Sequence, residues 1–341
     1  MDTVQNNNYE AKAYKSAQLV RWCPGCGDHG ILSNLHKAMA LLGIPPHNIA
    51  VISGIGCSSR LPYYMNTYGF HTIHGRGAAI ATGVKTANPD LSVWLATGDG
   101  DCLAIGGNHF IHALRRNVDI NIILMNNKIY GLTKGQYSPT SDRGFVSKSS
   151  PYGTVEDPFR PAELTIGARG RFFARTIDVD MKNSPEIMLQ AAKHKGTSVV
   201  EVLLNCVIFN DGIYDNIVKK EFRSDRTIFL RHGEKMLFGA DNDKGIVRDG
   251  FNLKAVNLND GLYSLDDVLV HDTHEEDPSL HLKLALMDGS DLPVALGVIR
   301  DVAAPVYDEE VDRQIAEVRQ RKPFRSLMDF LKAGETWRVD N

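Results

Sequence analysis

The chain has 341 residues, of which 43% are hydrophobic and 23% charged, a composition typical of a globular protein of about two domains. The 38 Lys and Arg residues against 41 Asp and Glu give a net charge of -3, which argues against a nucleic-acid partner. No apolar run reaches the roughly 18 residues of a membrane helix, and residues 1–18 lack the order of a signal peptide. We therefore expect a cytoplasmic protein without a membrane partner.

The polar residues 1–18 are expected to form an N-terminal arm. From Asp28 to about Leu42 the apolar residues recur with a helical period. Apolar runs then alternate with helical patterns, which predicts an α/β fold with a parallel sheet flanked by helices on both faces. The expected strands are Ile49–Ser53, Ser92–Thr97, Ile120–Met125, Phe172–Thr176 and Ser198–Leu204, with helices at about Ala78–Ala87, Leu103–Arg116 and Ser184–His194.

Two later segments are expected to have other roles. Residues 134–165 are rich in Ser, Pro, Gly, Thr and Asp and predict a long loop, of the kind that forms lids or partner contacts. After residue 212 charged segments alternate with short apolar pieces, and helices are expected near Asp308–Arg319 and Phe324–Lys332. We predict a cofactor-binding α/β domain over residues 19–212 and a C-terminal region, 213–341, that docks onto another subunit.

The five cysteines are too few and too scattered for a disulfide framework. Cys23 and Cys26 flank a Pro-Gly turn, which places both thiols on one side. Cys57 lies in a Gly-rich loop after the first strand, and Cys206 follows the last strand. Four such thiolates suit structural zinc or a four-iron cluster, and a thioredoxin-like pair also stays open. Cys102 is expected to be a buried, inert thiol.

Polar residues follow two predicted strands. Gly98-Asp99-Gly100-Asp101 follows one strand and Asn126-Asn127 the next, and the carboxyl ends of such strands form ligand sites. Asp99 and Asn127 offer the oxygen ligands that Mg²⁺ prefers when it holds a diphosphate, and the glycines let backbone N–H groups approach phosphate. With 25 residues between Gly100 and Asn126 and a whole helix–strand unit between them, the spacing is that of a thiamine-diphosphate (TPP) fingerprint.

A third glycine motif, His74-Gly75-Arg76-Gly77, precedes a predicted helix but follows no clear strand. As a dinucleotide-binding loop it is a weak match, because no acidic residue ends a following strand. We interpret it instead as a second contact to the phosphates or the thiazolium, with Arg76 supplying positive charge.

Taken together, the motifs resemble those of the beta subunits of 2-oxoacid:ferredoxin oxidoreductases. The sequence is most similar to the bacterial 2-oxoglutarate type, also called 2-oxoglutarate synthase, and the resemblance covers nearly the whole chain. The motifs that carry it are, in order, CPGC, GIGCSSR, HGRG, GDGD, NN with IYGLTKGQ, and NCVIFND.

The resemblance implies three bound groups and one substrate contact. A [4Fe-4S] cluster would be held by Cys23, Cys26, Cys57 and Cys206. Mg²⁺ would be bound by Asp99, Asn127 and the backbone oxygen of Ile129. Lys134 would meet the substrate carboxylate. The implied TPP contacts are Ile55, Gly56, Cys57, Ser58, His74, Gly75, Arg76, Gly100, Asp101, Gly131 and Leu132.

The resemblance also implies partners. TPP chemistry needs a carboxylate near the pyrimidine ring, and no second α/β domain is evident to supply it. An alpha subunit would complete the active site in an α2β2 heterotetramer. The implied reaction is the reversible oxidative decarboxylation of 2-oxoglutarate to succinyl-CoA and CO2, with coenzyme A as co-substrate and ferredoxin as electron acceptor.

Other interpretations stay open at this point. The substrate could be pyruvate or a broad range of 2-oxoacids, since each carries a carboxylate at C1. A cluster-free TPP decarboxylase of the phosphonopyruvate or sulfopyruvate type would leave the four cysteines unused. A structural-zinc protein and an interaction subunit with decayed cofactor sites are further alternatives, although the intact Asp99, Asn127 and cysteines speak against decay.

Overall fold

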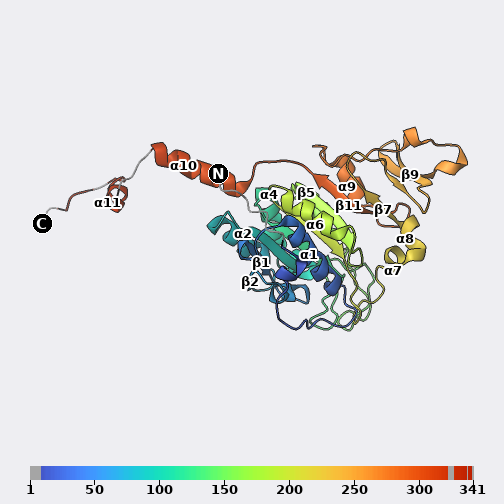
Figure 1. The fold of residues 1–341 in the computed structure, drawn as a ribbon, viewed down its shortest axis with the longest axis horizontal. Coiled ribbons are helices and arrows are strands. Elements are labelled where there is room, and N and C mark those ends of the chain that lie inside the picture. The colour runs from blue at the N-terminus through green and yellow to red at the C-terminus, as the bar shows by residue number, and fades with distance from the viewer. Residues whose placement is uncertain (1–8, 322–325, 336, 340–341) are drawn as a thin grey trace.

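The computed structural model describes residues 9–321, 326–335 and 337–339. Eight strands form one sheet in the order β2-β1-β3-β4-β6-β5-β11-β7 (Figure 1). Neighbouring strands are parallel except that β11 runs antiparallel to β5. The predicted strands are confirmed to within one residue at either end. The bounds are β1 Ile49–Ser53, β2 Tyr68–His71, β3 Ser92–Gly98, β4 Asn121–Asn126, β5 Phe172–Ile177, β6 Ser198–Leu203, β7 Thr227–Leu230 and β11 Val294–Asp301.

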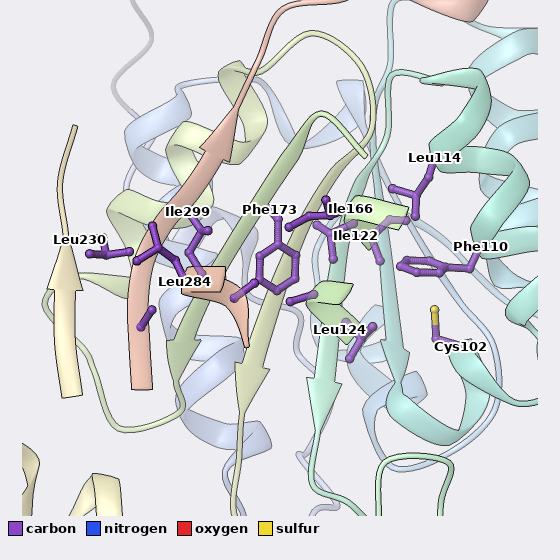
Figure 2. Close-up of a cluster of buried hydrophobic side chains, with 14 of the residues drawn as sticks. Cys102, Phe110, Leu114, Ile122, Leu124, Ile166, Phe173, Leu230, Leu284 and Ile299 are labelled. Atoms are coloured by element: carbon purple, nitrogen blue, oxygen red, sulfur yellow. The ribbon is translucent and has the colours of Figure 1, made fainter. Parts of the chain in front are cut away.

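Helices cover both faces of the sheet, as predicted. Alternate strand residues such as Phe172 and Val200 pack with α1 and α6 on one face. Their neighbours Phe173 and Val199 pack with the other helices on the opposite face, where Figure 2 shows part of the cluster with Cys102 at one end. The first face is covered by α1 (Asp28–Leu42) and α6 (Ser184–Lys193), and the second by α2 (Gly77–Ala87), α4 (Gly107–Arg116), α5 (Pro161–Gly167) and α9 (Ser279–Ala285).

Three expectations about local structure were wrong. The loop expected over residues 134–165 ends earlier, because helix α5 begins at Pro161. The helix expected over Leu103–Arg116 is two helices, α3 (Asp99–Leu103) and α4, because the backbone leaves the helical conformation at Ala104, where ψ is -108°. After this break the chain passes so close to the backbone oxygen of Asp101 that a Cβ on Gly106 would lie 2.4 Å from it, which requires glycine at that position. The segment before His74 does contain a strand, β2, which lies at the exposed edge of the sheet and therefore lacks an apolar run.

The chain after residue 212 extends the same sheet through β7 and β11. It also forms a small antiparallel sheet, and helix α10 extends away from the rest of the chain (Figure 1). The predicted last helix is found as α11, and its expected first two residues lie outside the described residues. The remaining elements are α7 Asp215–Val218, α8 Lys220–Arg226, β8 Leu237–Phe238, β9 Lys244–Asp249, β10 Asn252–Asn257, α10 Tyr307–Arg321 and α11 Leu327–Leu331, with 3-10 helices at Ala11–Tyr14, Pro46–Asn48, Ser58–Tyr64, Leu258–Asp260 and Leu265–Asp267.

The described part of the N-terminal segment packs on the sheet domain. Tyr14 is completely buried, and its hydroxyl donates a hydrogen bond to the backbone oxygen of Ile44 at 2.7 Å. Among the helices that the structure describes, none is both long enough and apolar enough to cross a bilayer.

Candidate cofactor site

The motif loops meet at the carboxyl edge of three adjacent parallel strands, β1, β3 and β4. Gly98, the last residue of β3, lies opposite Met125 of β4, so the turns that follow both strands leave the sheet side by side. A cavity of about 470 Å³ opens between these turns. Ligands of open α/β sheets bind at this edge.

Most of the predicted site residues line this cavity. They are Ile55, Gly56, Cys57, Ser58, His74, Asp99, Gly100, Asp101, Asn127, Ile129, Gly131 and Leu132. Six predicted residues are not among the lining residues: Gly75, Arg76 and Lys134, and the cysteines Cys23, Cys26 and Cys206, which are described below. Gly75 and Arg76 lie in the loop behind His74, where the Arg76 guanidinium donates to the backbone oxygen of Ile105 at 3.3 Å. Lys134 is exposed and has a φ of 75°.

Asp101 ties the loops of the site together rather than leaving its oxygens free. Its Oδ1 accepts hydrogen bonds from the backbone N–H groups of Ile55 at 3.1 Å and Gly75 at 2.7 Å, and pairs with His74 Nδ1 at 2.7 Å. Its Oδ2 accepts from the Thr97 hydroxyl at 2.9 Å. With both oxygens engaged, Asp101 fixes the loops after β1 and β2 against β3.

Asp99 is bonded differently. Within the described part of the chain, only its Oδ2 accepts side-chain hydrogen bonds, from the hydroxyls of Ser138 and Thr140, both at 2.5 Å. Burial raises the pKa of Asp99 to about 6 despite these two donors. A buried carboxylate with this shift is expected to gain stability from a nearby cation.

The second predicted Mg²⁺ turn is also held in place. The side-chain oxygen of Asn127 accepts from the backbone N–H of Ile129 at 3.1 Å, and its backbone oxygen accepts from the Asn210 amide at 2.9 Å. The turn faces Gly100, where a Cβ would lie 2.2 Å from the Tyr130 ring. Tyr130 donates its hydroxyl to the backbone oxygen of Gly100 at 2.9 Å, so this position has room only for glycine.

The cysteine loops meet beside the same cavity. A Cβ on Gly131 would lie 3.5 Å from the Cys206 sulfur and 3.7 Å from the Cys57 sulfur, so these two thiols flank the wall of the cavity. Burial, with smaller contributions from the Asp28 carboxylate and from the Cys206 and Cys23 thiols, raises the pKa of Cys57 to about 11. The fifth cysteine is buried in the core as predicted.

Cys26 lies between this group and a buried carboxylate. Its thiol donates to Asp28 Oδ2 at 3.4 Å, and burial, the Asp28 charge and Cys206 raise the pKa of Cys26. Cys23 is the exposed member of the set. Burial raises the pKa of Asp28 to about 6. Asp28 lines the cavity, and its Oδ1 has no hydrogen-bond partner among the residues that the structure describes.

Among the described residues, no group of three or more His, Cys, Asp or Glu side chains is close enough to share a single metal ion. A structural zinc ion requires its ligands to converge in this way, since they all lie about 2.0–2.3 Å from one point. A four-iron cluster does not require it, because each thiolate binds a different iron and the four sulfurs lie further apart. The donor set of four cysteines from three loops fits the cluster in its chemistry.

Sequence reasoning missed several lining residues and the hydroxyls that hold Asp99. Ser138 and Thr140 lie about forty positions after Asp99 in a loop, and no motif links them to it. Asp28 directly follows the Cys-Pro-Gly-Cys-Gly segment, which could have drawn attention to it. The lining residues that were not predicted are Asp28, Gly98, Met125, Tyr130, Thr133 and Gln136.

The match to a known family falls on the same edge of the sheet. Residues 54–202 match the thiamine pyrophosphate enzyme, C-terminal TPP binding domain. This span begins in the loop after β1 and ends in β6, so it includes both the Asp99 turn and the Asn127 turn. The fold and the site therefore define a TPP-binding protein.

Relatives that match a longer part of the chain identify the family more closely. The chain is 46% identical over 334 residues to 2-oxoglutarate oxidoreductase subunit KorB of Mycobacterium tuberculosis, covering 97% of this chain and 89% of that protein. It is 47% identical over 214 residues to 2-oxoacid:ferredoxin oxidoreductase 1, subunit beta, of Aeropyrum pernix, covering 63% of this chain and 66% of that one. The chain belongs to the family of 2-oxoacid:ferredoxin oxidoreductase beta subunits, which confirms the predicted resemblance.

A solved structure agrees over the whole length. The 2-oxoglutarate:ferredoxin oxidoreductase from Magnetococcus marinus, with 2-oxoglutarate, coenzyme A and succinyl-CoA bound, has a TM-score of 0.76 and 33% sequence identity. The match covers 97% of both chains, so it includes the region after residue 212 as well as the TPP-binding part.

Proposed function

We propose that this chain is the beta subunit of a 2-oxoglutarate:ferredoxin oxidoreductase. The overall reaction consumes 2-oxoglutarate and coenzyme A, gives succinyl-CoA, CO2 and a proton, and passes two electrons to ferredoxin. When bound, TPP supplies the carbanion that attacks the 2-oxo carbon, and the cluster supplies an electron acceptor. The observation that carries the proposal is the position of Cys57, which lines the cavity while its thiol lies beside Cys206.

In this proposal Asp99, Asn127 and the backbone oxygen of Ile129 hold Mg²⁺, and through it the diphosphate. The raised pKa of Asp99 supports the role, because a buried carboxylate gains most from a cation. Gly100 lets the backbone approach the phosphates, and Asp101 keeps the neighbouring loops in place through its hydrogen bonds. These residues bind and orient the cofactor.

Cys23, Cys26, Cys57 and Cys206 would hold the [4Fe-4S] cluster. The raised pKa values of Cys26 and Cys57 mean that both thiols keep their protons near neutral pH without a metal. Iron binding must then displace those protons, since the thiolate is the ligand. Cys23, at the surface, marks the side of the cluster nearest to an external electron acceptor.

The remaining parts of the proposal concern partners and substrate. Relatives carry the name subunit beta, which supports an alpha subunit that completes the active site, and we propose an α2β2 assembly in the cytoplasm. The region after residue 212 would contribute to subunit docking. The assignment of Lys134 to the substrate carboxylate stays a prediction, and its exposed position would suit a contact made after the alpha subunit binds.

The test is an anaerobic assay of the chain produced together with its alpha subunit. We expect reduction of ferredoxin or of a viologen dye that requires both 2-oxoglutarate and coenzyme A, with a kcat/KM at least tenfold lower for pyruvate. Equal rates with pyruvate would shift the proposal to a broad 2-oxoacid enzyme. Release of CO2 from the 2-oxoacid without dye reduction would support the cluster-free decarboxylase instead.

A further inference from the structure

A buried ion pair lies in the middle of the sheet, in two strands whose other residues are mostly apolar. The Arg175 Nε of β5 donates to Glu201 Oε2 of β6 at 2.7 Å, and the two side chains are 8% and 2% exposed. Strand register places Glu201 directly between Arg175 and Leu124 of β4. Such pairs cost desolvation energy, and apolar replacements are often as stable, so fold stability alone is a weak reason for this one.

The second carboxylate oxygen of Glu201 contacts Asn126, which lies on the side of the cofactor site. Glu201 Oε1 accepts a hydrogen bond from the side-chain amide of Asn126 at 2.8 Å. This contact fixes which way the Asn126 amide points and turns its oxygen toward Thr140, whose hydroxyl lies 3.0 Å away. Each of these side chains is buried, and all three border a second cavity of about 450 Å³.

Thr140 connects this group to Asp99. Its hydroxyl is 2.5 Å from Asp99 Oδ2, 3.0 Å from the Asn126 oxygen and 3.1 Å from the Ser138 hydroxyl, and its one hydrogen is shared between the acceptors Asp99 and Asn126. The position of the hydroxyl is therefore set from both sides. Besides Asp99, the Thr140 hydroxyl hydrogen-bonds only with Ser138 and Asn126 among the described side chains, so moving the Asn126 amide would remove one of the two contacts that position it on Asp99.

We propose that Glu201 is a positioning residue for Asp99, acting through Asn126 and Thr140. Held by Arg175, Glu201 orients the Asn126 amide, which keeps the Thr140 hydroxyl in place on one oxygen of Asp99. The other oxygen of Asp99 is then directed toward the cation. The inference rests on the proposed Mg²⁺ site and adds to it a support that begins three strands away from Asp99, in β5.

A double-mutant cycle on the full chain in complex with its alpha subunit tests this. Glu201→Gln keeps the shape but removes the charge that orients Asn126, and Thr140→Val removes the hydroxyl at nearly constant volume. The readout is the dissociation constant for Mg²⁺ at saturating TPP, measured by calorimetry. Because groups that orient a metal ligand typically change metal affinity 10- to 100-fold, we expect about a tenfold loss for each single variant.

If Glu201 acts on Asp99 through Asn126 and Thr140, a connection called the relay below, the two losses of Mg²⁺ affinity should not multiply in the double variant. Glu201→Gln should weaken Mg²⁺ binding less than twofold further in the Thr140→Val background, because the connection is already broken. Thr140→Ser, which retains the hydroxyl, should bind Mg²⁺ like the unchanged protein. Thr176→Val is a matched control, because Thr176 is equally buried in β5 but its hydroxyl pairs with Ser184 at 2.7 Å. In the Thr176→Val background, Glu201→Gln should weaken Mg²⁺ binding as much as it does in the unchanged protein.

If the losses of Mg²⁺ affinity from Glu201→Gln and Thr140→Val multiply in the double variant, the relay is wrong and Glu201 has only a structural role. If Glu201→Gln fails to fold, Asn126→Ala replaces it, since that change leaves the Arg175–Glu201 pair intact and the same non-additivity is expected. Absence of Mg²⁺-dependent TPP binding in the unchanged complex would instead contradict the proposed function. The two failures are thus separate results.

Discussion

The cofactor edge, meaning the loops after β1, β3 and β4 together with Asp28 at the start of α1, and the C-terminal region after residue 212 use buried charge in opposite ways. At the cofactor edge, burial raises the pKa values of Asp28 and Asp99 to about 6, and one oxygen of Asp28 has no hydrogen-bond partner among the described residues. In the C-terminal region, buried Arg300 donates to the backbone oxygens of Glu275 at 2.9 Å and Glu276 at 3.1 Å.

The comparison distinguishes residues that bind a ligand, such as Asp99, from residues that stabilise the fold, such as Arg300. Arg300 uses its charge to close a loop, so removing it should cost stability and leave cofactor binding intact. Asp99 costs stability in the folded chain and regains it only from a cation. Substitutions in the C-terminal region should therefore change stability and leave cofactor binding intact, whereas substitutions at the cofactor edge should weaken cofactor binding. The following variants test this difference.

The largest effect is expected at the cluster. Cys206→Ser should lose the [4Fe-4S] cluster and abolish ferredoxin reduction, because an alcohol is a poor iron ligand beside three thiolates. Iron and sulfide analysis checks the loss. Cys102→Ala is the matched control, since Cys102 is buried in the core away from the cavity lining and should keep its iron. Full iron content in Cys206→Ser would remove Cys206 from the ligand set.

Asp99→Asn should separate stability from binding most clearly. We expect Mg²⁺-dependent TPP affinity to fall at least 100-fold, because a ligand charge is lost. Without cofactor the variant should be more stable than the original chain at pH 7, by up to about 3 kcal/mol, because the folded pKa of about 6 lies above the unfolded value of 3.8.

The sign of that stability difference depends on pH. Ionising Asp99 costs more in the folded chain, so the advantage of Asn should be absent below about pH 4, grow as the pH rises toward 6 and then level off. Urea unfolding of both proteins across this range measures it. A variant that is less stable than the original chain at pH 7 would show that Asp99 serves the fold.

Gly100→Ala tests the close packing at the site. Its methyl group would lie 2.2 Å from the Tyr130 ring, so the ring must move. Overpacking of this kind costs about 1–3 kcal/mol, and we expect a similar loss of TPP binding energy, about tenfold in affinity. Adding Tyr130→Leu should recover stability. Unchanged TPP affinity in Gly100→Ala would place the diphosphate away from this turn.

A smaller, pH-dependent effect is expected in the C-terminal region. Burial lowers the pKa of His271 to about 4, and the ring is held by a hydrogen bond at 2.9 Å between Nε2 and the Val298 backbone oxygen. The unfolded chain binds a proton first, so this histidine should lower stability as the pH falls from about 6.5 to 4, by up to about 3 kcal/mol.

His271→Gln should flatten that part of the stability curve while TPP binding is retained. His47→Gln, at an exposed histidine, is the control and should leave the curve unchanged. Loss of TPP binding in His271→Gln would show that the C-terminal region supports the cofactor edge, against the contrast drawn above.

How far the sequence could predict the molecule depended on whether the signal was local. The apolar runs of β1, β3 and β4 are buried on both faces, so they were predicted to within one residue, and the motifs at their ends lie together as parallel strands require. Strand β2 has four exposed residues and was missed. Its pairing with β1 depends on backbone hydrogen bonds, which leave no apolar pattern.

The same limit applies inside the site. The motifs predicted Asp99 and Asn127, but the hydroxyls of Ser138 and Thr140 come from a loop with no recognisable spacing. Asp101 was expected to contact TPP, and its hydrogen bonds with three loop residues add a structural role that only tertiary contacts could show. Glu201 sits in an apolar strand pattern that hides its connection to Asn126.

The central claim is that this edge of the sheet holds a [4Fe-4S] cluster and Mg²⁺-TPP side by side. The most direct measurement is the iron, sulfide, zinc and TPP content of the anaerobically purified complex, together with its visible spectrum. We predict four irons and four sulfides per beta chain, a broad brown absorption and about one TPP. Zinc in place of iron, or TPP without any metal cluster, would contradict the claim.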